Sequence, residues 1–341
     1  GVLSALIGRF HGGPAQVGVM SSTLFGGVSG SAVADASAIG SLMIPWHRRL
    51  GYPPAFSAAT LAAAATIDIL IPPSIPMILF ALSANASIAA LFVAGIVPGL
   101  LMCAGFMGVC WWVGRRRGFP RDTTPFAWPA FRRHLLYASP ALLLPVLIIV
   151  FLRLGIATPT EVAVLSTLHA GLVSAVVYRD LGWRRLNDAV VHAGLATGVV
   201  LLVIMASAAI GWLLTFDRMP DDIVQWVQSH VHSAWLVIVL MNLLMLFIGM
   251  FIDLPAAVLL LTPVFVPLAQ SIGMDMTQLG IMMVVNLALG LYTPPVGTTL
   301  FITSSLARVK VGQTVRELIP FYLVALAVLA LVSYVPASIL R

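Results

Sequence analysis

Charged side chains are scarce in this sequence. Asp, Glu, Lys and Arg make up 9% of its 341 residues, whereas 60% are hydrophobic and the mean hydropathy is +1.04. Soluble domains carry about 25% charged residues, so the composition excludes an ordinary soluble protein. Apolar stretches of about 20 residues, long enough to cross the hydrocarbon layer of a bilayer, recur along the chain. We therefore predict an all-α polytopic membrane protein.

Cysteines and catalytic motifs are nearly absent as well. Cys103 and Cys110 are the only cysteines, and on one helix they would be about 10 Å apart, too far for a disulfide. The histidines show no metal-ligand spacing, and the sequence has no Walker A loop, no His-Glu-x-x-His and no Gly-x-Ser-x-Gly. ATP-driven transport therefore gets no support, and we expect neither a cofactor nor an enzyme.

The net charge of +6 indicates membrane topology rather than binding to nucleic acid. Basic residues gather in short segments between apolar stretches, as the positive-inside rule requires of cytoplasmic loops. The pattern holds if residues 14–46 and 234–270 are hairpins that return to their own side of the membrane. The predicted cytoplasmic side then holds Arg9 and the Lys and Arg residues of segments 47–52, 114–133, 179–188 and 306–316.

A break within a long apolar segment occurs twice. The first break, Thr66–Pro76, contains Pro72-Pro73, and proline interrupts a helix because it lacks an N–H and its ring clashes with the preceding turn. Adding 222 to each residue number aligns the two halves of the chain without a gap. The alignment superimposes Pro45 on Pro267, Pro72-Pro73 on Pro294-Pro295, Pro98 on Pro320, Gly27 on Gly249 and Gly51 on Gly273. Repeats with paired broken helices are typical of secondary transporters.

The alignment predicts two repeats joined by a basic cytoplasmic linker at 114–133. The first repeat, residues 1–113, is expected to hold a re-entrant hairpin at 12–46, a broken helix at 54–83 and a helix at 88–113. The second repeat, residues 134–341, is expected to hold scaffold helices within 134–216, a hairpin at 234–270, a broken helix at 276–305 and a helix at 316–338. The hairpin arms, about 14 residues each, are short for a crossing.

The number of crossings predicts that the repeats are inverted. Four crossings separate the two broken helices, so these helices should run in opposite directions, and the hairpin tips should meet them near the middle of the membrane. This is the arrangement of an elevator-type ion transporter. The second repeat has scaffold helices before its hairpin and the first has none in this sequence, so we expect roughly 90 residues of N-terminal helices to be missing before Gly1.

The breaks and tips supply oxygen atoms for ion binding. Hydroxyl groups and unwound backbone carbonyls suit Na⁺, the coupling ion that we expect here. The predicted ligands are Ser29, Ser31, Asp68, Ile71 and Pro73 at the first site, and Phe251, Gly290, Thr293 and Pro295 at the second. Predicted substrate contacts are Ser31, Ser74, Asp253 and Thr298. For each Ser or Thr the alternative is a hydrogen bond back to its own helix.

Three acidic residues allow a structural role. Asp35 is interpreted as a first-turn charge that balances the helix dipole rather than as an ion ligand. Asp253 corresponds to Ser31 in the first repeat, and it either caps the helix ahead of Pro255 or supplies a functional charge. Glu161, in Thr158-Pro159-Thr160-Glu161, is predicted to lie in the first turn of a helix.

Several stretches together resemble the large membrane subunit of tripartite ATP-independent periplasmic (TRAP) transporters of the C4-dicarboxylate type. The similar stretches are Gly27–Gly40, Ile69–Pro76, Phe92–Leu100, Thr158–Glu161, Gly249–Asp253 and Asn286–Gly297. The resemblance implies Na⁺-driven uptake of a small organic acid by an elevator motion in the bacterial inner membrane. It also implies a small membrane subunit and a periplasmic binding protein as partners. Asp68 departs from the pattern, because the family usually has Gly at this position.

Other functions remain possible from the sequence. A Na⁺/dicarboxylate carrier that needs no binding protein would show the same paired breaks. An intramembrane aspartyl protease could use Asp35 and Asp68, although their contexts, Val33-Ala34-Asp35 and Thr66-Ile67-Asp68, do not match the Tyr-Asp and Gly-x-Gly-Asp patterns of that class. A structural scaffold would explain neither the paired breaks nor the polar tips.

Overall fold

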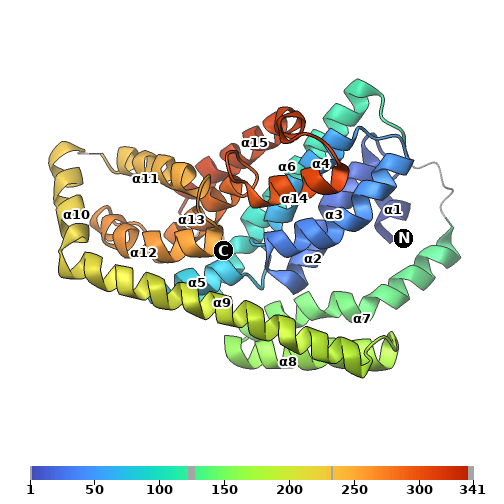
Figure 1. Cartoon of the computed structure of the whole chain (residues 1–341), viewed down its shortest axis with the longest axis horizontal. Helices are drawn as coiled ribbons and strands as arrows, with labels where there is room; N and C mark the ends of the chain where they lie inside the picture. Colours follow the sequence, from blue (N-terminus) through green and yellow to red (C-terminus); the bar gives the residue numbers. More distant parts are fainter. Residues whose placement is uncertain (1, 122–126, 232, 337–341) are drawn as a thin grey trace.

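The computed structural model describes residues 2–121, 127–231 and 233–336 (Figure 1). Within these ranges the chain forms helices and no strands. Six helices are long and apolar enough to cross a membrane, namely Ile88–Arg117, Phe131–Arg153, Pro159–Val177, Trp183–Leu213, Leu254–Ser271 and Val311–Tyr334. These features confirm the prediction of an all-α polytopic membrane protein.

The first third of the chain forms two hairpin arms, a broken helix and one long helix. After a short helix α1 (Val2–Ile7), the elements are α2 (Gly13–Ser29), α3 (Ala32–Arg49), α4 (Pro54–Ala64), the 3-10 turn η1 (Ala65–Ile67), α5 (Ile75–Ala84) and α6 (Ile88–Arg117). The hairpin tip is therefore only Gly30 and Ser31, and the break in the broken helix covers 68–74.

The last third of the chain has the same order of elements. They are α11 (Ala234–Gly249), α12 (Leu254–Ser271), α13 (Met276–Gly290), α14 (Thr298–Ala307) and α15 (Val311–Tyr334). Adding 222 to the bounds of α3 gives 254–271, the bounds of α12, and adding 222 to the start of α4 gives 276, the start of α13. The two sets of elements therefore correspond helix by helix.

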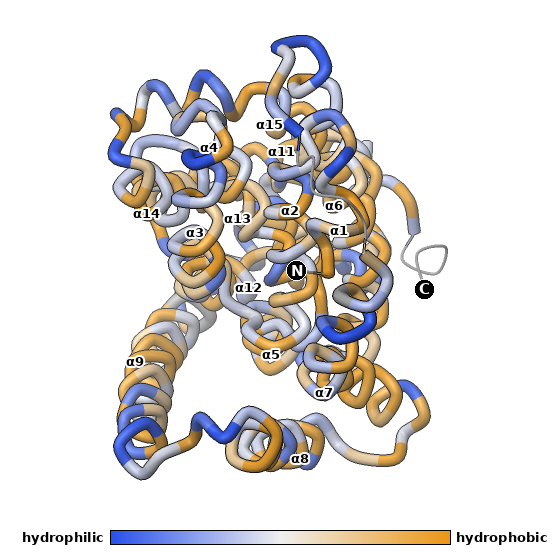
Figure 2. The backbone as a smooth tube through the Cα atoms, turned by 90° about the vertical axis from the view of Figure 1, so that its right-hand side faces the viewer, coloured by the Kyte–Doolittle hydropathy of each residue, from blue (hydrophilic) through white to orange (hydrophobic). Residues whose placement is uncertain are grey.

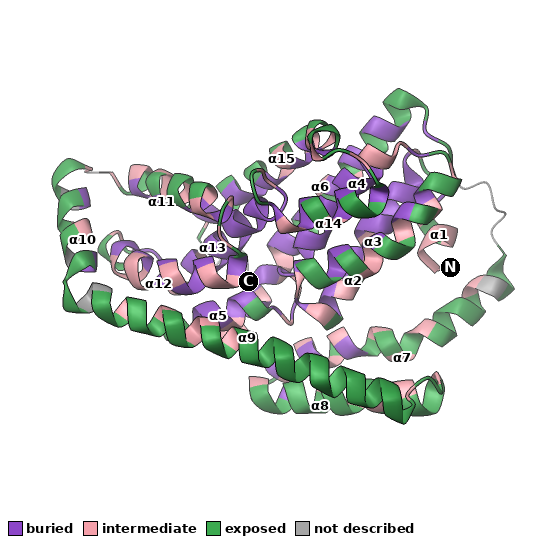
Figure 3. Ribbon diagram, viewed as in Figure 1, coloured by how far each residue is buried: buried purple, intermediate pink, exposed green. Residues whose placement is uncertain are grey.

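The middle of the chain lies apart from the packed centre. It contains α7 (Trp128–Arg153), α8 (Pro159–Leu172), the π-helical turn η2 (Val173–Val177), α9 (Trp183–Phe216) and α10 (Met219–His230). Helices α7, α8 and α9 line one side of the molecule (Figures 1 and 2), and α9 is exposed along most of its length (Figure 3). No residue in the most apolar window of α9 is fully buried, although one side of the helix packs against α12.

Several helix boundaries differ from the predicted ones. The hairpin arms α2, α3, α11 and α12 are 16 to 18 residues long, longer than predicted, and of these four α12 is the one both long and apolar enough to cross a membrane. The basic segments 179–188 and 306–316 are partly helical, because α9 begins at Trp183 and α15 at Val311. The acidic segment 217–232 contains the amphipathic helix α10. Residues 122–126 of the linker, His232 and the predicted end of the last helix at 337–338 lie outside the described residues.

The first halves of the two broken helices form the centre of the fold. Nearly all residues of α4 and α13 are buried (Figure 3). Neither helix has a polar face, as expected for a helix surrounded by protein on all sides. Six of the eleven residues in α4 are alanine, and such small side chains allow neighbouring helices to approach closely in a membrane.

The two repeats exchange contacts. The returning arm of the first hairpin, α3, packs against α14 of the second broken helix, and the returning arm of the second hairpin, α12, packs against α5 of the first. Because α3 corresponds to α12 and α5 corresponds to α14, the two contacts are equivalent in the two repeats. Each hairpin therefore holds part of the broken helix in the opposite repeat, and the two tips are brought toward one another.

The predicted topology can be tested by labelling single cysteines. The native Cys103 and Cys110 are buried, so the unmodified protein is the background control. We expect Arg121→Cys to react with a membrane-impermeant maleimide only in inverted vesicles and Asp217→Cys only in right-side-out cells, because the charge distribution places these exposed residues on opposite sides. Labelling of both variants from the same side would contradict the inverted arrangement.

Candidate functional site

In the first broken helix, the helical backbone ends at η1 and resumes at α5. Its Pro72-Pro73 peptide bond is cis. Ser74 occupies the N-cap position of α5, where its hydroxyl accepts from the Met77 N–H at 3.4 Å and donates across the break to the Ile69 carbonyl at 2.6 Å. The buried Ser74 side chain thus replaces hydrogen bonds that the interrupted helix cannot make.

The second break is stabilised by a threonine and by the neighbouring hairpin. Its Pro294-Pro295 bond is also cis. The Thr299 N–H and hydroxyl both donate to the Leu291 carbonyl, at 2.9 and 2.8 Å. The Val296 N–H donates to the carbonyl of Met250 in the second hairpin at 3.2 Å. The chain therefore crosses the break with its backbone bound partly to itself and partly to the hairpin tip.

A buried carboxylate joins the first tip to the first break. The N–H groups of Gly30 and Ser31 donate to the two oxygens of Asp68, each at 3.1 Å, and Asp68 is 0% exposed. Gly30 has φ +64°, and a Cβ added there would lie 2.5 Å from the Pro73 carbonyl oxygen. The tip needs glycine both for this backbone conformation and for the close approach.

The second tip and break are in direct backbone contact. Gly290 is the repeat counterpart of Asp68, and a Cβ added to it would lie 2.2 Å from the carbonyl oxygen of Gly249. The two repeats therefore use different chemistry at the same position. The first repeat inserts a carboxylate between the hairpin and the break, whereas the second places two backbones against each other.

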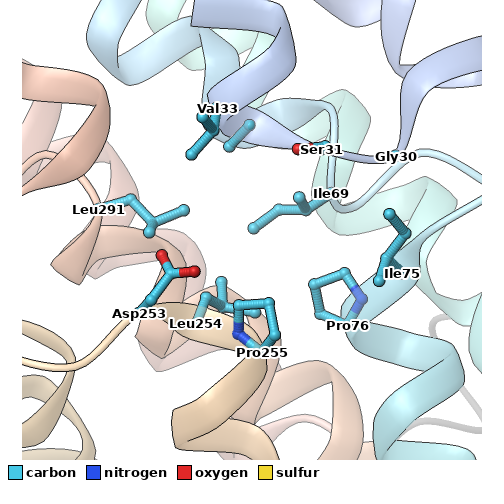
Figure 4. Close-up of a pocket in the computed structure, with 11 residues that line it drawn as sticks. Gly30, Ser31, Val33, Ile69, Ile75, Pro76, Asp253, Leu254, Pro255 and Leu291 are labelled. Carbon is cyan, nitrogen blue, oxygen red and sulfur yellow. The ribbon is translucent and has the colours of Figure 1, made fainter. Parts of the chain in front are cut away.

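The two tips enclose a pocket, shown in Figure 4. Its walls come from both repeats and include Ser31 of the first tip and Asp253 of the second. The first residues of α3, α5 and α12 also line it. Helix N-termini carry a partial positive charge, so the pocket favours an anionic group alongside the Asp253 carboxylate.

Some predicted substrate contacts lie in this pocket and others do not. Ser31 and Asp253 line it, whereas Ser74 and Thr298 are absent from its walls. Ser74 is the helix cap described above. Asp253 stands at the N-cap position of α12. Its side chain makes no standard capping hydrogen bond but interacts with the N–H of Leu254, the first residue of the helix, and its carboxylate faces the pocket (Figure 4). The Thr298 hydroxyl is buried without a hydrogen-bond partner among the described residues.

The predicted ion ligands lie at the tips and breaks. Within the described residues, no backbone N–H outside the helices donates to the carbonyl oxygens of Ile71, Pro73, Phe251 or Pro295. The Gly290 carbonyl accepts from the Thr293 N–H at 3.0 Å. The Thr293 hydroxyl donates to its own helix at Leu289, at 2.6 Å, which is the alternative predicted for such residues. The Ser29 hydroxyl donates weakly to the Ser31 carbonyl, at 3.5 Å.

Two further polar residues lie close to the first break. Asp35, in the first turn of α3, is 1% exposed and faces both Ser22 of α2 and Asp68. Asp35 therefore lies in the first helical turn, as predicted, and it is buried there. In the sequence, only its position one turn after Ser31 indicates that Asp35 lies near the first break. The contact with Ser22 could not be predicted, because it depends on how α2 and α3 pack.

The arrangement of breaks, tips and pocket defines a class of protein. Two corresponding broken helices, each met by a hairpin tip, surround one pocket inside a polytopic helical protein. Such discontinuous helices with sites at the repeat interface characterise secondary transporters.

Comparison with known proteins identifies the family. The family described as tripartite ATP-independent periplasmic transporter, DctM component, matches residues 1–338. The chain therefore belongs to the DctM family, the large permeases of TRAP transporters, which are secondary transporters of organic acids. This membership points to a transporter rather than an enzyme. Although Asp35 and Asp68 lie near each other, both are buried and Asp68 is bonded to the first tip, so an aspartyl protease gains no support.

Three relatives cover nearly the whole chain. The chain is 56% identical over 329 residues to uncharacterized protein y4mL of Sinorhizobium fredii, covering 96% of this chain and 78% of the relative. It is 36% identical to the C4-dicarboxylate TRAP transporter large permease protein DctM of Pseudomonas aeruginosa, covering 98% and 78%. It is 37% identical to the isethionate TRAP transporter permease protein DctMQ of Oleidesulfovibrio alaskensis, covering 97% and 52%.

The backbone contact at the second tip gives a testable prediction. Gly290→Ala should destabilise the folded protein by about 1–3 kcal/mol, because its methyl group would overlap the Gly249 backbone. Thermal unfolding in detergent should show a lower midpoint than in the unmodified protein. Gly108→Ala in α6 is the matched control, since an added Cβ there meets nothing within 4 Å. Equal stability of the two variants would show that the close contact is not required.

Proposed function

We propose that this protein carries out Na⁺-coupled uptake of a small organic acid across the bacterial inner membrane. The solute would be delivered by a periplasmic binding protein, and a small membrane subunit would complete the transporter. The observation that carries the proposal is the pocket lined by both hairpin tips. Because its walls come from the hairpins and broken helices of both repeats, a movement of these elements together against the scaffold helices would change the side to which the pocket opens.

The oxygen atoms around the two breaks support Na⁺ as the coupling ion. One ion would bind the first tip and break through Ser29, Ser31 and the carbonyls of Asp68, Ile71 and Pro73. A second would bind through the carbonyls of Phe251, Gly290 and Pro295 together with Thr293. Na⁺ prefers hard oxygen ligands, and unwound backbone supplies them without a buried charge. Bound Na⁺ would also hold each tip against its break and so shape the pocket between them.

The chemistry of the pocket supports an organic acid as the solute. Three helix N-termini favour a carboxylate or sulfonate, whereas Asp253 can accept hydrogen bonds from hydroxyl groups on the same molecule. The names of two similar relatives specify a C4-dicarboxylate and isethionate. Both are small acids, which agrees with this assignment. Ser74, predicted as a substrate contact, would act indirectly by capping α5, whose first residues line the pocket.

The exposed helices support a partner within the membrane. The apolar residues of α8 and α9 are mostly exposed, and one relative bears the name DctMQ, a single permease chain of which this chain covers 52%. A separate small subunit packed against these helices would complete the scaffold. The hairpins and broken helices would then move as a unit against it, which is the elevator motion.

Transport by purified protein tests the proposed function. The full transporter in proteoliposomes, with its binding protein and a panel of organic acids, should accumulate one of them only when an inward Na⁺ gradient is imposed. Uptake without Na⁺ would contradict the proposed coupling. Na⁺-driven uptake that is unchanged when the binding protein is omitted would instead support the carrier that needs no binding protein.

Ser31→Ala is expected to weaken Na⁺ dependence. The substitution removes a hydroxyl oxygen at the first tip, and the loss of about 1 kcal/mol per neutral polar contact should raise the Na⁺ concentration for half-maximal uptake about fivefold. Ser31 also caps α3, accepting from the Ala34 N–H, so Ser87→Ala is the matched control: Ser87 caps α6 in the same way, away from the pocket. Identical Na⁺ dependence in both variants would remove Ser31 from the ion site.

Asp253→Asn is expected to impair uptake while the protein still folds. The variant keeps the shape of the side chain but removes the charge that faces the pocket, and uptake should fall at least about tenfold if that charge holds a donor of the solute. The control is Asp275→Asn, because Asp275 caps α13 through Thr277 and Gln278 outside the pocket. Normal uptake by Asp253→Asn would show that the charge has no role.

A further inference from the structure

Two buried acidic side chains lie near each other in the first repeat. Asp35 and Asp68 are 1% and 0% exposed, and they are close enough to interact electrostatically. Neither is part of the ion pairs found among the described residues, Arg117–Glu317 and Arg185–Asp180. The region between α2, α3 and the first break therefore brings two acidic side chains together inside the protein.

Three buried oxygen atoms in this region have no hydrogen bond of good geometry. Both carboxylate oxygens of Asp35 and the hydroxyl oxygen of Ser22 are without a partner by distance and angle among the described residues. Ser22 is 0% exposed and lies close enough to Asp35 to interact with it from α2, but its single O–H can satisfy only one of the two carboxylate oxygens. Buried polar atoms are almost always satisfied, and an unpaired buried charge is strongly unfavourable. A cluster of unsatisfied oxygens facing one another is the arrangement that a bound cation stabilises.

Asp68 can contribute to such a site while it holds the first tip. Each of its oxygens accepts one N–H, from Gly30 and from Ser31, and a carboxylate oxygen has a second lone pair available for a cation. Asp68 thereby links a site at Asp35 to the hairpin tip that lines the substrate pocket. The site is close to the first Na⁺ site proposed above but differs from it, because that site uses the Asp68 carbonyl rather than its side chain.

We propose that Asp35, Asp68 and Ser22 bind an additional monovalent cation, Na⁺, beyond the two coupling ions. This proposal rests on the proposed Na⁺-coupled function and deepens it. Two carboxylates and a hydroxyl supply hard oxygen ligands, and the two charges of Asp35 and Asp68 are balanced when this cation and the first coupling ion are both bound. The protein would therefore bind one more Na⁺ than its neutral tips and breaks can hold.

The second repeat has no equivalent site. The counterparts of Ser22, Asp35 and Asp68 are Leu244, Ala257 and Gly290, none of which has an oxygen in its side chain. The additional cation is thus a property of the first repeat in this chain.

Equilibrium binding of radioactive Na⁺ to the purified transporter tests the proposal without a transport assay. Asp35→Asn should reduce the number of Na⁺ bound at saturation by about one, and Asp68→Gly should do the same. Ser22→Ala should keep the number but weaken the affinity of one ion about fivefold, as expected for a lost neutral ligand. Asp217→Asn, at an exposed position, is the control and should match the unmodified protein.

Thermal unfolding with and without Na⁺ provides a second readout, because a ligand that binds only the folded state stabilises it. Asp35→Asn should lose part of the stabilisation by Na⁺ and, without Na⁺, should be no less stable than the unmodified protein, since it removes a buried charge.

The possible failures are distinguishable. If the unmodified protein binds no Na⁺, the coupling in the proposed function fails with this proposal. If it binds Na⁺ and Asp35→Asn binds an equal number, only the additional site is overturned. The proposal is also overturned if Asp35→Asn changes the pH dependence of uptake but not the number of Na⁺ bound, because a proton would then neutralise the carboxylates.

Discussion

The structure depends on one constraint, which is that backbone groups released by a broken helix inside a membrane must find partners. Lipid offers no hydrogen bonds, so irregular backbone persists only where it is buried in protein or lines a water-filled cavity. Two proline pairs break two helices here, and each break is met by the tip of a hairpin. Ser74 and Thr299 satisfy part of each break locally, while Asp68 and the Met250 carbonyl link the breaks to the tips.

This constraint also explains why the functional groups are where they are. A tip that reaches a break from across the fold must end near the centre, and the exchange of contacts between α3 and α14 and between α12 and α5 brings both tips to one place. Carbonyls at the breaks can bind cations, and the helix N-termini that follow the tips face the pocket. The same irregular backbone thus creates the proposed ion sites and the proposed substrate site. Ion binding and substrate binding can therefore be coupled directly, without a chain of residues between distant sites.

The sequence predicted the fold well where the physics is local or repeated. Proline pairs, glycine-rich tips and the 222-residue offset marked both breaks and both tips, because each reflects a backbone requirement that few residues satisfy. Helix ends in the basic and acidic segments were mispredicted, because these polar segments were interpreted as loops. Charged residues such as Arg184 and Arg185 are good helix formers, so a helix can continue through them. The roles of Asp35 and Ser74 could not be predicted, because they depend on which side chains α2, α3 and the break place against one another.

The central claim is that Na⁺ holds each hairpin tip against its break and so forms one pocket from both repeats. Hydrogen–deuterium exchange of the full transporter, with Na⁺ or with an equal concentration of a large organic cation, tests it most directly. We expect Na⁺ to slow exchange at both tips, around residues 30–34 and 250–254, and at both breaks, around 65–71 and 290–299, with little change in α7, α8 and α9. Slower exchange at only one repeat, or none at either break, would contradict the account.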